Sequence, residues 1–285
     1  MNSTQIGVDL AKSVFEIAIS TAPGRVQERH RLSRAAFAGL FVNRPAARVV
    51  LEACGSAHHW ARTLQRLGHE VTLLHPGDVA RYRDGNKTDR ADAKALLEAA
   101  RNEALDPVPI KSLDHQALIT LHRLRQGYLQ TRTARTNAVR GHLREFGCVI
   151  PLGARGVVPQ AQLALATDAV PAIVRSPLAV VLAEIVELEE KIVRLREELA
   201  RLATASAEAQ WLLTVPGIGG LTATAMIGFV GSIQRFRSGR ALAAYLGLTP
   251  REASSGGIRH LGRITKRGNP YLRMLLIHGA RSKLL

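Results

Sequence analysis

The stretch 5-QIGVDLAKSVFEIAIS-20 decides the fold class of the first third of the chain. Ile6 and Val8 alternate with small or polar neighbours, and the apolar pattern resumes at Val14 after a short turn, which predicts two successive strands. Farther along the chain, helices are expected at 33–43, 57–67 and 88–102, and strands at 47–52 and 70–75. Strands that alternate with helices indicate an α/β layer with parallel pairing.

The middle of the chain is predicted to be helical. A long helix with one basic side is expected from about Asp114 to Phe146, followed by a loop rich in Gly and Pro over 147–159. Ser176 and Pro177 suit the N-cap and N1 positions of a second long helix. Its apolar residues recur at spacings of three and four, as in an a/d heptad seam: Leu178, Val181, Ile185, Leu188, Ile192, Leu195, Leu199 and Leu202.

This coiled-coil seam has two candidate partners. We favour a second copy of the chain, in a homodimer, because the apolar repeat extends over more than three heptads with charged flanks. Packing against the basic helix at 114–146 of the same chain is the alternative.

Positive charge dominates the composition. The 285 residues carry a formal net charge of +16, and an apolar content of 46% is enough for real cores. Eleven Lys/Arg and one acid, Glu252, lie between Arg235 and Leu285. Such a chain usually binds a polyanion, most often nucleic acid, with an acidic membrane surface as the alternative. Aromatic residues make up only 4%, which argues against a single-strand binder built on stacking platforms.

Cysteine spacing and apolar runs bear on the cellular compartment. Cys54 and Cys148 show no C-x-x-C spacing, which suits a reducing cytoplasm and argues against a disulfide scaffold or a zinc site. No run approaches 18 uncharged apolar residues, and Met1 leads into a strand-like segment instead of a signal peptide. We therefore expect a cytoplasmic protein with no membrane partner.

Four carboxylates form the candidate catalytic set. Asp9 and Glu52 interrupt or end apolar strands, where a lone carboxylate is costly to bury unless it is paired or holds a metal. Asp89 and Asp92 are three residues apart in the first turn of a predicted helix, so they point the same way. Carboxylates are the ligands that Mg²⁺ prefers, and two such ions can hold the attacking and leaving oxygens of a phosphodiester. This order of acids predicts a ribonuclease-H/RuvC-like nuclease domain.

Each acid also has a simpler explanation when it is taken singly. Asp9 could cap a turn, Glu52 could pair with an arginine, and the helical pair could complement the helix dipole. The order of all four within an α/β layer of a basic chain favours the metal site. Three further acids in turn-like contexts are interpreted as surface residues: Asp78, Asp84 and Asp106.

The last part of the chain begins with 213-LTVPGIGGLTATAMIGFVG-231, which is similar to a helix-hairpin-helix element. Its glycine turn, with Gly217 and Gly219, would present backbone N–H groups to a phosphate, and a tight turn between packed helices is the alternative. The predicted domains are therefore 1–110, a helical coiled-coil region at 111–208, and a mainly helical domain at 209–285.

Several stretches together resemble a known family, the DEDD-type insertion-sequence transposases whose members act as bridge-RNA-guided DNA recombinases. The stretches are GVDLAKSVFEIA, VLEACGSAHHWARTLQRLGHEVTLLHP, GNKTDRADAKALLEAA, LLTVPGIGGLTATAMIGFVG and AYLGLTPREASSGGIRHLGRITKRGNPYLRMLLIHGAR. The similarity covers nearly the whole length. Relatives of this type usually continue past LLIHGAR with a further helical tail, whereas this sequence ends at Leu285.

The resemblance implies a bacterial enzyme that cuts and rejoins DNA through a covalent phosphoserine link. It assigns the D-E-D-D acids, which would hold two Mg²⁺ ions, to Asp9, Glu52, Asp89 and Asp92, in a RuvC-like N-terminal domain. It also implies a coiled-coil insertion and a C-terminal transposase domain that carries the serine. A guide RNA would pair with both target and donor DNA, so that the protein need only hold nucleic-acid backbones.

The stretch 251-REASSGGIRHLGRITKR-267 would carry the nucleophile. The resemblance favours Ser255, which directly precedes a glycine, with Ser254 as the second choice. Nearby cations would hold phosphate and offset charge in the transition state: Arg259, Arg263, Lys266 and Arg267. Two rival functions remain at this point, a RuvC-like junction nuclease that uses metal-activated water and a decayed transposase that only binds nucleic acid.

Overall fold

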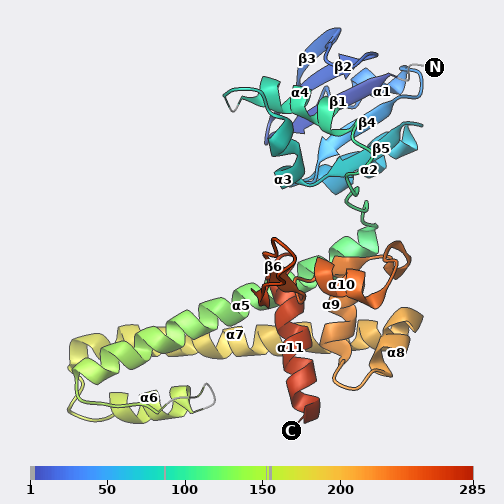
Figure 1. The fold of residues 1–285 in the computed structure, drawn as a ribbon. Coiled ribbons are helices and arrows are strands. Elements are labelled where there is room, and N and C mark those ends of the chain that lie inside the picture. The colour runs from blue at the N-terminus through green and yellow to red at the C-terminus, as the bar shows by residue number, and fades with distance from the viewer. Residues whose placement is uncertain (1–3, 87, 152, 154–155, 285) are drawn as a thin grey trace. The chain divides into compact units, whose positions relative to one another are not determined.

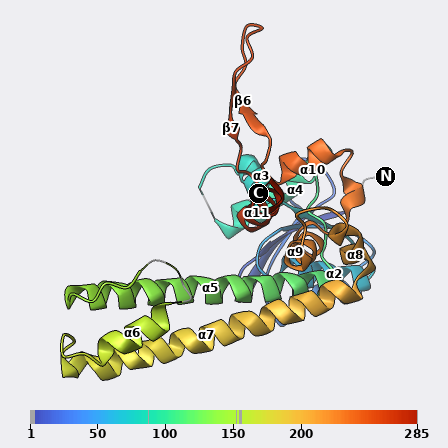
Figure 2. The same ribbon diagram turned by 90° about the horizontal axis from the view of Figure 1, so that it is seen from below.

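The computed structural model describes residues 4–86, 88–151, 153 and 156–284. The chain divides into two compact units, residues 1–111 and residues 112–285, and Figures 1 and 2 show the elements of each. The predicted division of the second unit into 111–208 and 209–285 stays a prediction.

The first unit contains a five-stranded mixed sheet with the strand order β3-β2-β1-β4-β5 (Figure 1). The sheet confirms the parallel pairing and the four strands that the sequence predicted, whereas β3 was not predicted. The central strand β1 pairs antiparallel with β2 and parallel with β4, and β4 continues the parallel pairing to β5. The strands are β1 Gln5–Leu10, β2 Val14–Ser20, β3 Glu28–Ser33, β4 Arg48–Glu52 and β5 Glu70–Leu74.

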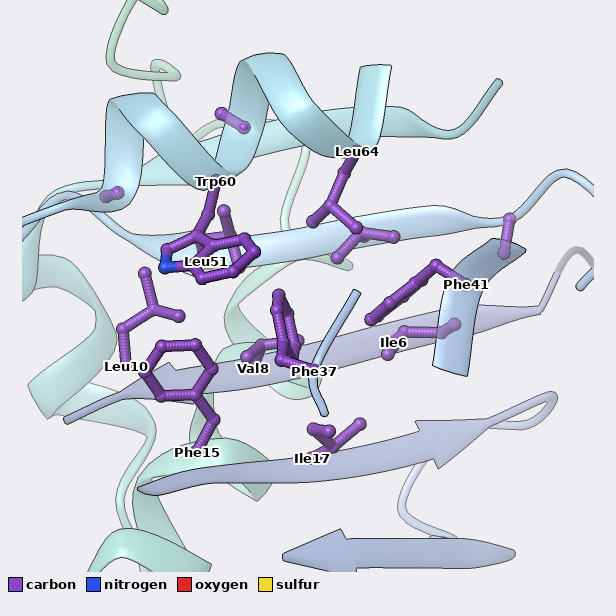
Figure 3. Close-up of a cluster of buried hydrophobic side chains, with 14 of the residues drawn as sticks. Ile6, Val8, Leu10, Phe15, Ile17, Phe37, Phe41, Leu51, Trp60 and Leu64 are labelled. Carbon is purple, nitrogen blue, oxygen red and sulfur yellow. The ribbon is translucent and has the colours of Figure 1, made fainter. Parts of the chain in front are cut away.

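One face of the sheet is covered by the main apolar core of this unit (Figure 3). Alternate residues of the strands, such as Ile6 and Val8, point into it because side chains in a strand alternate between the two faces. Helix α2, Ala57–Arg66, contributes Trp60, whose ring packs edge-on against Phe37 at 4.8 Å between centroids. The predicted helix at 57–67 is thereby confirmed.

The opposite face of the sheet is covered by α4, Asp89–Ala99. A Cβ on Gly7 would lie 2.5 Å from the carbonyl oxygen of Ala93, so the helix approaches the strand closely only because residue 7 is glycine. The Thr88 hydroxyl accepts a hydrogen bond from the Ala91 N–H at 3.2 Å and caps the helix. Two short segments precede it, α3 Pro76–Val79 and the 3₁₀ turn η1 Ala80–Tyr82.

The prediction of a helix over 33–43 was wrong. Within this range the chain forms turns over 34–38 and only one helical turn, α1 Gly39–Val42. The edge strand β3, which ends at Ser33, was not predicted because its residues, ERHRLS, are mostly polar and show no apolar alternation; it pairs with β2 through its backbone. Phe37 and Phe41 of this range are both buried in the core.

The second unit is built on two long helices, α5 Leu113–Glu145 and α7 Ala172–Ala205, which pack against each other and are joined through α6 Val157–Leu165. The first part of the apolar seam of α7 is covered by this packing: its residues Leu178 and Ile185 share a core cluster with Val139 and Leu143 of α5. The seam therefore has the intrachain partner that the sequence left as the alternative. Pairing with a second copy stays a prediction.

The predicted start of α7 was wrong. The helix begins at Ala172 with Pro171 at the N-cap, so that Pro177 lies inside the helix. The missing N–H of a proline this close to the start leaves only one carbonyl, that of the exposed Ile173, without its usual helical partner. Arg175 supports the earlier start because its guanidinium donates to the carbonyl oxygens of Thr167 and Val170, both at 2.8 Å.

The last part of the second unit is mainly helical and also contains a β-hairpin. Tyr271 and Leu272 of the last helix pack against Ala225 and Met226 of α9. The imidazole of the fully buried His122 of α5 lies between the hydroxyls of Tyr271, at 3.0 Å, and Thr224, at 3.1 Å. The elements are α8 Ala207–Leu213, α9 Gly220–Val230, η2 Ile233–Arg235, α10 Gly239–Tyr245, β6 Pro250–Glu252, β7 Leu261–Ile264 and α11 Pro270–Leu284.

Candidate functional site

A row of charged residues crosses the α4 face of the sheet at one end. Asp9 of β1 is paired with Glu16 of β2, and Glu16 is paired with Arg31 of β3. Glu52 of β4 lies one residue beyond the last paired position of β1 and β4, beside Asp9. Since paired residues of neighbouring strands point to the same face, the row runs Arg31, Glu16, Asp9, Glu52. The two predicted strand acids therefore meet on the face that the apolar core leaves free.

The first turn of α4 brings the two predicted helix acids to the same end of the sheet. Asp92 is buried with 8% of its surface exposed, and Asp89 is exposed. The carboxylate of Asp92 accepts a charge-assisted hydrogen bond from Nε of Arg83, which lies on the segment before α4. The structure therefore brings all four predicted acids together and pairs the most buried one with an arginine.

The electrostatics of Asp9 show how closely the acids converge. Burial, together with the nearby charges of Asp92, Asp89, Glu52 and Glu16, raises the pKa of Asp9 to about 6. Mutual repulsion of this kind is relieved by a cation, and an all-oxygen donor set of carboxylates fits a hard divalent ion. Within the described ranges no three acidic, histidine or cysteine side chains are already arranged around a common metal position.

The predicted serines lie on the hairpin formed by β6 and β7, which Figure 2 shows as an arm of the second unit. Ser255 and Ile258 exchange backbone hydrogen bonds across the tip, with Gly256 and Gly257 between them at φ of 55° and 78°. Two consecutive residues with positive φ make a type I′ turn, which requires glycine or a similar residue at both positions. The two glycines therefore set the geometry of the hairpin tip, and Ser255 is exposed there.

The two serine hydroxyls differ in their hydrogen bonds. The Ser254 hydroxyl donates to Oε1 of Glu252 at 2.8 Å and accepts from the backbone N–H of His260 at 3.2 Å. Among the residues that the structure describes, no group hydrogen-bonds the Ser255 hydroxyl. Ser254 thus helps to hold the two strands of the hairpin together, whereas the Ser255 hydroxyl takes no part in hydrogen bonds with the described residues.

The base of the hairpin is held by close backbone packing. A Cβ on Gly247 would lie 2.0 Å from the carbonyl oxygen of Arg267, and one on Gly268 would lie 2.0 Å from that of Tyr245. Arg273 of α11 donates to the carbonyl oxygens of Leu246 and Arg267, at 3.0 and 2.9 Å. The four predicted phosphate-binding cations lie exposed along the hairpin and at its base, and Arg259 also pairs with Glu252 at 3.3 Å: Arg259, Arg263, Lys266 and Arg267.

The glycine turn before α9 has a packing role. Gly217 has a φ of +88°, and a Cβ there would lie 2.6 Å from the carbonyl oxygen of Gly279 in α11. The requirement for glycine at this position is explained by the close approach of α11. Gly219 at the N-cap of α9 is exposed, and its contact with phosphate stays a prediction.

Sequence reasoning missed two residues of the acidic site. Glu16 could have been found, because it is a lone acid in the apolar run VFEIAIS, opposite Asp9 in the predicted pair of strands. Arg83 carried no such signal, since its contact with Asp92 depends on the path of the chain before α4. Of the acids interpreted as surface residues, Asp84 and Asp106 are exposed, while Asp78 is partly buried and pairs with Arg81 at 3.4 Å.

Comparison with known proteins places this architecture in a family. A DEDD-type IS110 transposase model matches residues 6–147, and the model of the transposase IS116/IS110/IS902 family matches residues 209–284. The chain belongs to the IS110 family of insertion-sequence transposases. The first match contains all four acids and the second contains the serine hairpin, so both candidate regions of this transposase lie within family-defining segments.

Individual relatives match over almost the whole chain. A probable family 20 transposase of Pseudomonas aeruginosa is 42% identical over 99% of this chain and 84% of its own length. The transposase for insertion sequence element IS1111A of Coxiella burnetii is 38% identical over 98% of this chain and 77% of its own length. The transposase for element IS1328 of Yersinia enterocolitica is 35% identical over 98% of this chain and 84% of its own length.

In the described part of this chain, no helix combines the length and the apolar character that a membrane span needs.

Proposed function

We propose that this transposase cuts and rejoins DNA by transesterification, with Mg²⁺ held by Asp9, Glu52, Asp89 and Asp92 and with the Ser255 hydroxyl as the nucleophile. The observation that carries the proposal is the convergence of the four acids on one end of the sheet, where burial and the charges of the neighbouring carboxylates raise the pKa of Asp9 to about 6. Bound Mg²⁺ would polarise the phosphodiester and stabilise charge on its oxygens. Membership of a transposase family supports the same proposal.

The serine step conserves phosphodiester bonds. The Ser255 Oγ attacks phosphorus and loses its proton, an Oγ–P bond forms, and the bond from phosphorus to a deoxyribose oxygen breaks while that oxygen takes up a proton. A later attack by a DNA hydroxyl on the phosphoserine restores a DNA phosphodiester and frees the serine. Arg259 and Arg263 are exposed on the same hairpin and would hold the phosphate and offset its developing charge.

Ser255 is favoured over Ser254 by the hydrogen bonds of the hairpin. A hydroxyl that already donates to Glu252 and accepts from the His260 N–H must break those bonds before it can attack. The Ser255 hydroxyl has no such bond among the described residues and stands at the exposed tip of the arm. The turn glycines beside it add no side chain that would keep a DNA backbone away.

The guide RNA and the assembly belong to the same proposal. A basic protein whose described cations are spread along an exposed arm suits backbone contacts to RNA and DNA more than base reading. We propose that a bridge-type RNA selects target and donor DNA, that Gly219 contributes a backbone N–H to phosphate, and that copies associate as a dimer or a dimer of dimers.

A denaturing gel tests the nucleophile. Labelled DNA from an end of the element is incubated with the protein, Mg²⁺ and the noncoding RNA of the element, and protein-linked DNA is measured. Wild type and Ser254→Ala should form adducts, Ser255→Ala should form none, and Asp9→Asn should form few. Adducts that persist in Ser255→Ala and vanish in Ser254→Ala would move the assignment to Ser254.

The same gel separates the rival mechanism. A junction nuclease that uses metal-activated water would cut DNA without any protein-linked product, and its cutting would survive both serine substitutions. Repeating the reaction without RNA tests the guide: adducts that form equally well without RNA would remove the guide RNA from the proposal.

A further inference from the structure

A hollow lined by arginines lies beside the acidic site in the first unit. It measures about 530 Å³ and lies between the edge strand β3 and the first turn of α4. Two residues of the acidic site, Glu16 and Asp89, also line this hollow. Its other lining residues are Arg29, His30, Arg31, Thr88 and Arg90. We call this hollow the β3–α4 groove.

Two arginines of the β3–α4 groove, Arg29 and Arg90, lie close together. Nη1 of Arg29 donates to the backbone carbonyl oxygen of Arg90 at 3.3 Å, and burial together with the charge of Arg90 lowers the pKa of Arg29. Neither side chain forms an ion pair with any residue that the structure describes. Like charges held together in this way cost free energy, and an anion between them would recover it.

Glu16, one of the two acids of the groove, already pairs with an arginine other than Arg29 and Arg90. Glu16 pairs with Arg31 at 3.4 Å and is opposite Asp9 in the sheet. His30 points to the other side of β3, where its Nε2 lies 3.2 Å from the Glu28 carboxylate. Arg29 and Arg90 are therefore the arginines of the groove that have no ion-pair partner among the described residues, although the charge of Glu16 partly offsets that of Arg90 at Arg29.

We propose that the β3–α4 groove binds a backbone phosphate of the DNA strand whose neighbouring phosphodiester lies at the carboxylates. Two guanidiniums suit a phosphate because each offers a fork of N–H donors that matches its oxygens. The groove is continuous with the acidic site through Glu16 and Asp89, so one strand passes from the arginines to the metal ligands. The site thereby contributes to positioning and reads no base. This inference rests on the proposed function in taking the acids as the place of the chemistry.

Equilibrium binding in the absence of metal tests the groove. Fluorescence anisotropy of a labelled single-stranded DNA oligonucleotide is measured at several salt concentrations in EDTA, with the full chain as wild type and as Arg29→Ala/Arg90→Ala. The slope of log K against log salt should become shallower by about 0.7 for each phosphate that the variant no longer binds. Arg66→Ala is the matched control, because Arg66 is exposed on α2 and lines no part of the groove.

Three outcomes have distinct meanings. A shallower slope for the double variant, with Arg66→Ala unchanged, supports the groove. An unchanged slope overturns it, and so does a weakening seen with an RNA oligonucleotide of the same sequence but absent with DNA. Thermal unfolding is measured in parallel, and the double variant should unfold no earlier than wild type, because relief of the Arg29–Arg90 repulsion offsets the missing hydrogen bond.

The binding test is independent of the proposed chemistry. Ser255→Ala should keep the wild-type slope, since the hydroxyl takes no part in this contact. If wild type forms no DNA adducts but the double variant still shows the shallower slope, the proposed function fails and the groove stands. If adducts depend on Ser255 while the slope is unchanged in the double variant, only the groove fails.

Discussion

The carboxylates and the serine are positioned by opposite means. The acids sit on a sheet whose other face is a packed apolar core, so that the alternation of each strand fixes where every carboxylate points. The serines sit on a two-stranded arm whose residues from Pro250 to Gly262 are all exposed. Packing of the sheet holds the carboxylates close together despite their mutual repulsion. The position of the serines depends instead on the geometry of the turn and on the close backbone packing at the base of the hairpin.

The largest expected effect is the loss of activity in Asp9→Asn. If the carboxylates hold the metal, adduct formation should fall at least about 1,000-fold, since a ligand is removed from the centre of the site. The melting temperature should not fall, because the substitution removes a charge that lies among four other carboxylates. Asp106→Asn, an exposed acid of the same unit, is the control that should change neither quantity. A large fall in melting temperature with Asp9→Asn would show that the acids stabilise the sheet.

The base of the hairpin should be far less tolerant than its tip. Gly247→Ala places a Cβ 2.0 Å from a backbone oxygen at a φ of +72°, and we expect a loss of about 3 kcal/mol in the free energy of unfolding. Gly256→Ala, at a φ of +55° with no atom within 4 Å of its Cβ, should cost about 1 kcal/mol. Urea unfolding measures both, and equal costs would contradict the difference between base and tip.

Acid should weaken the second unit through His122. Burial, with a smaller contribution from Arg125, lowers the pKa of His122 to about 4 from an ordinary value of 6.5. Between these values the unfolded chain binds the proton and the folded one does not, so stability is complete above about pH 6.5 and falls as the pH drops toward 4. This difference in proton binding should lower the free energy of unfolding by up to about 3 kcal/mol at low pH.

Unfolding by urea across this pH range checks the His122 prediction. His122→Gln should be less stable than wild type at pH 7 and should lose less stability on acidification. His278→Asn removes an imidazole of α11 outside this buried cluster and should leave the wild-type pH profile unchanged. An identical pH profile in His122→Gln would exclude His122 as the titrating group.

The smallest of these effects concerns the contact between Arg83 and Asp92. Arg83→Gln leaves the buried carboxylate without its cation, and in EDTA the free energy of unfolding should fall by about 1–2 kcal/mol. Added Mg²⁺ should stabilise the variant more than wild type, because the ion no longer competes with the guanidinium. Lys94→Gln, which removes a surface pair with Asp84, should respond to Mg²⁺ as wild type does. An equal response in all three proteins would argue against Mg²⁺ at Asp92.

Several features of the site were predictable from residue patterns alone. The four acids were predicted at the ends of strands and on one helix turn. An isolated carboxylate in an apolar run is noticeable in the sequence because its burial costs free energy. Glu16 is also a lone carboxylate in an apolar run, and it could have been predicted in the same way. Arg29 and Arg31 were hidden because β3 has no apolar alternation, and an edge strand paired through its backbone leaves no such pattern in its side chains.

Residue patterns were enough to predict the periodic features: an α/β first unit, two long helices, an apolar seam, and a Ser-Ser-Gly-Gly stretch among cations. The surfaces that pack against one another became known from the folded chain. In the structure the seam packs against α5, and α7 begins before Pro177. Arg83 pairs with Asp92, and the Ser254 hydroxyl is hydrogen-bonded while Ser255 lies at the exposed tip. The physical reason is that periodicity fixes which face a residue occupies, whereas its partner depends on segments brought together by the fold.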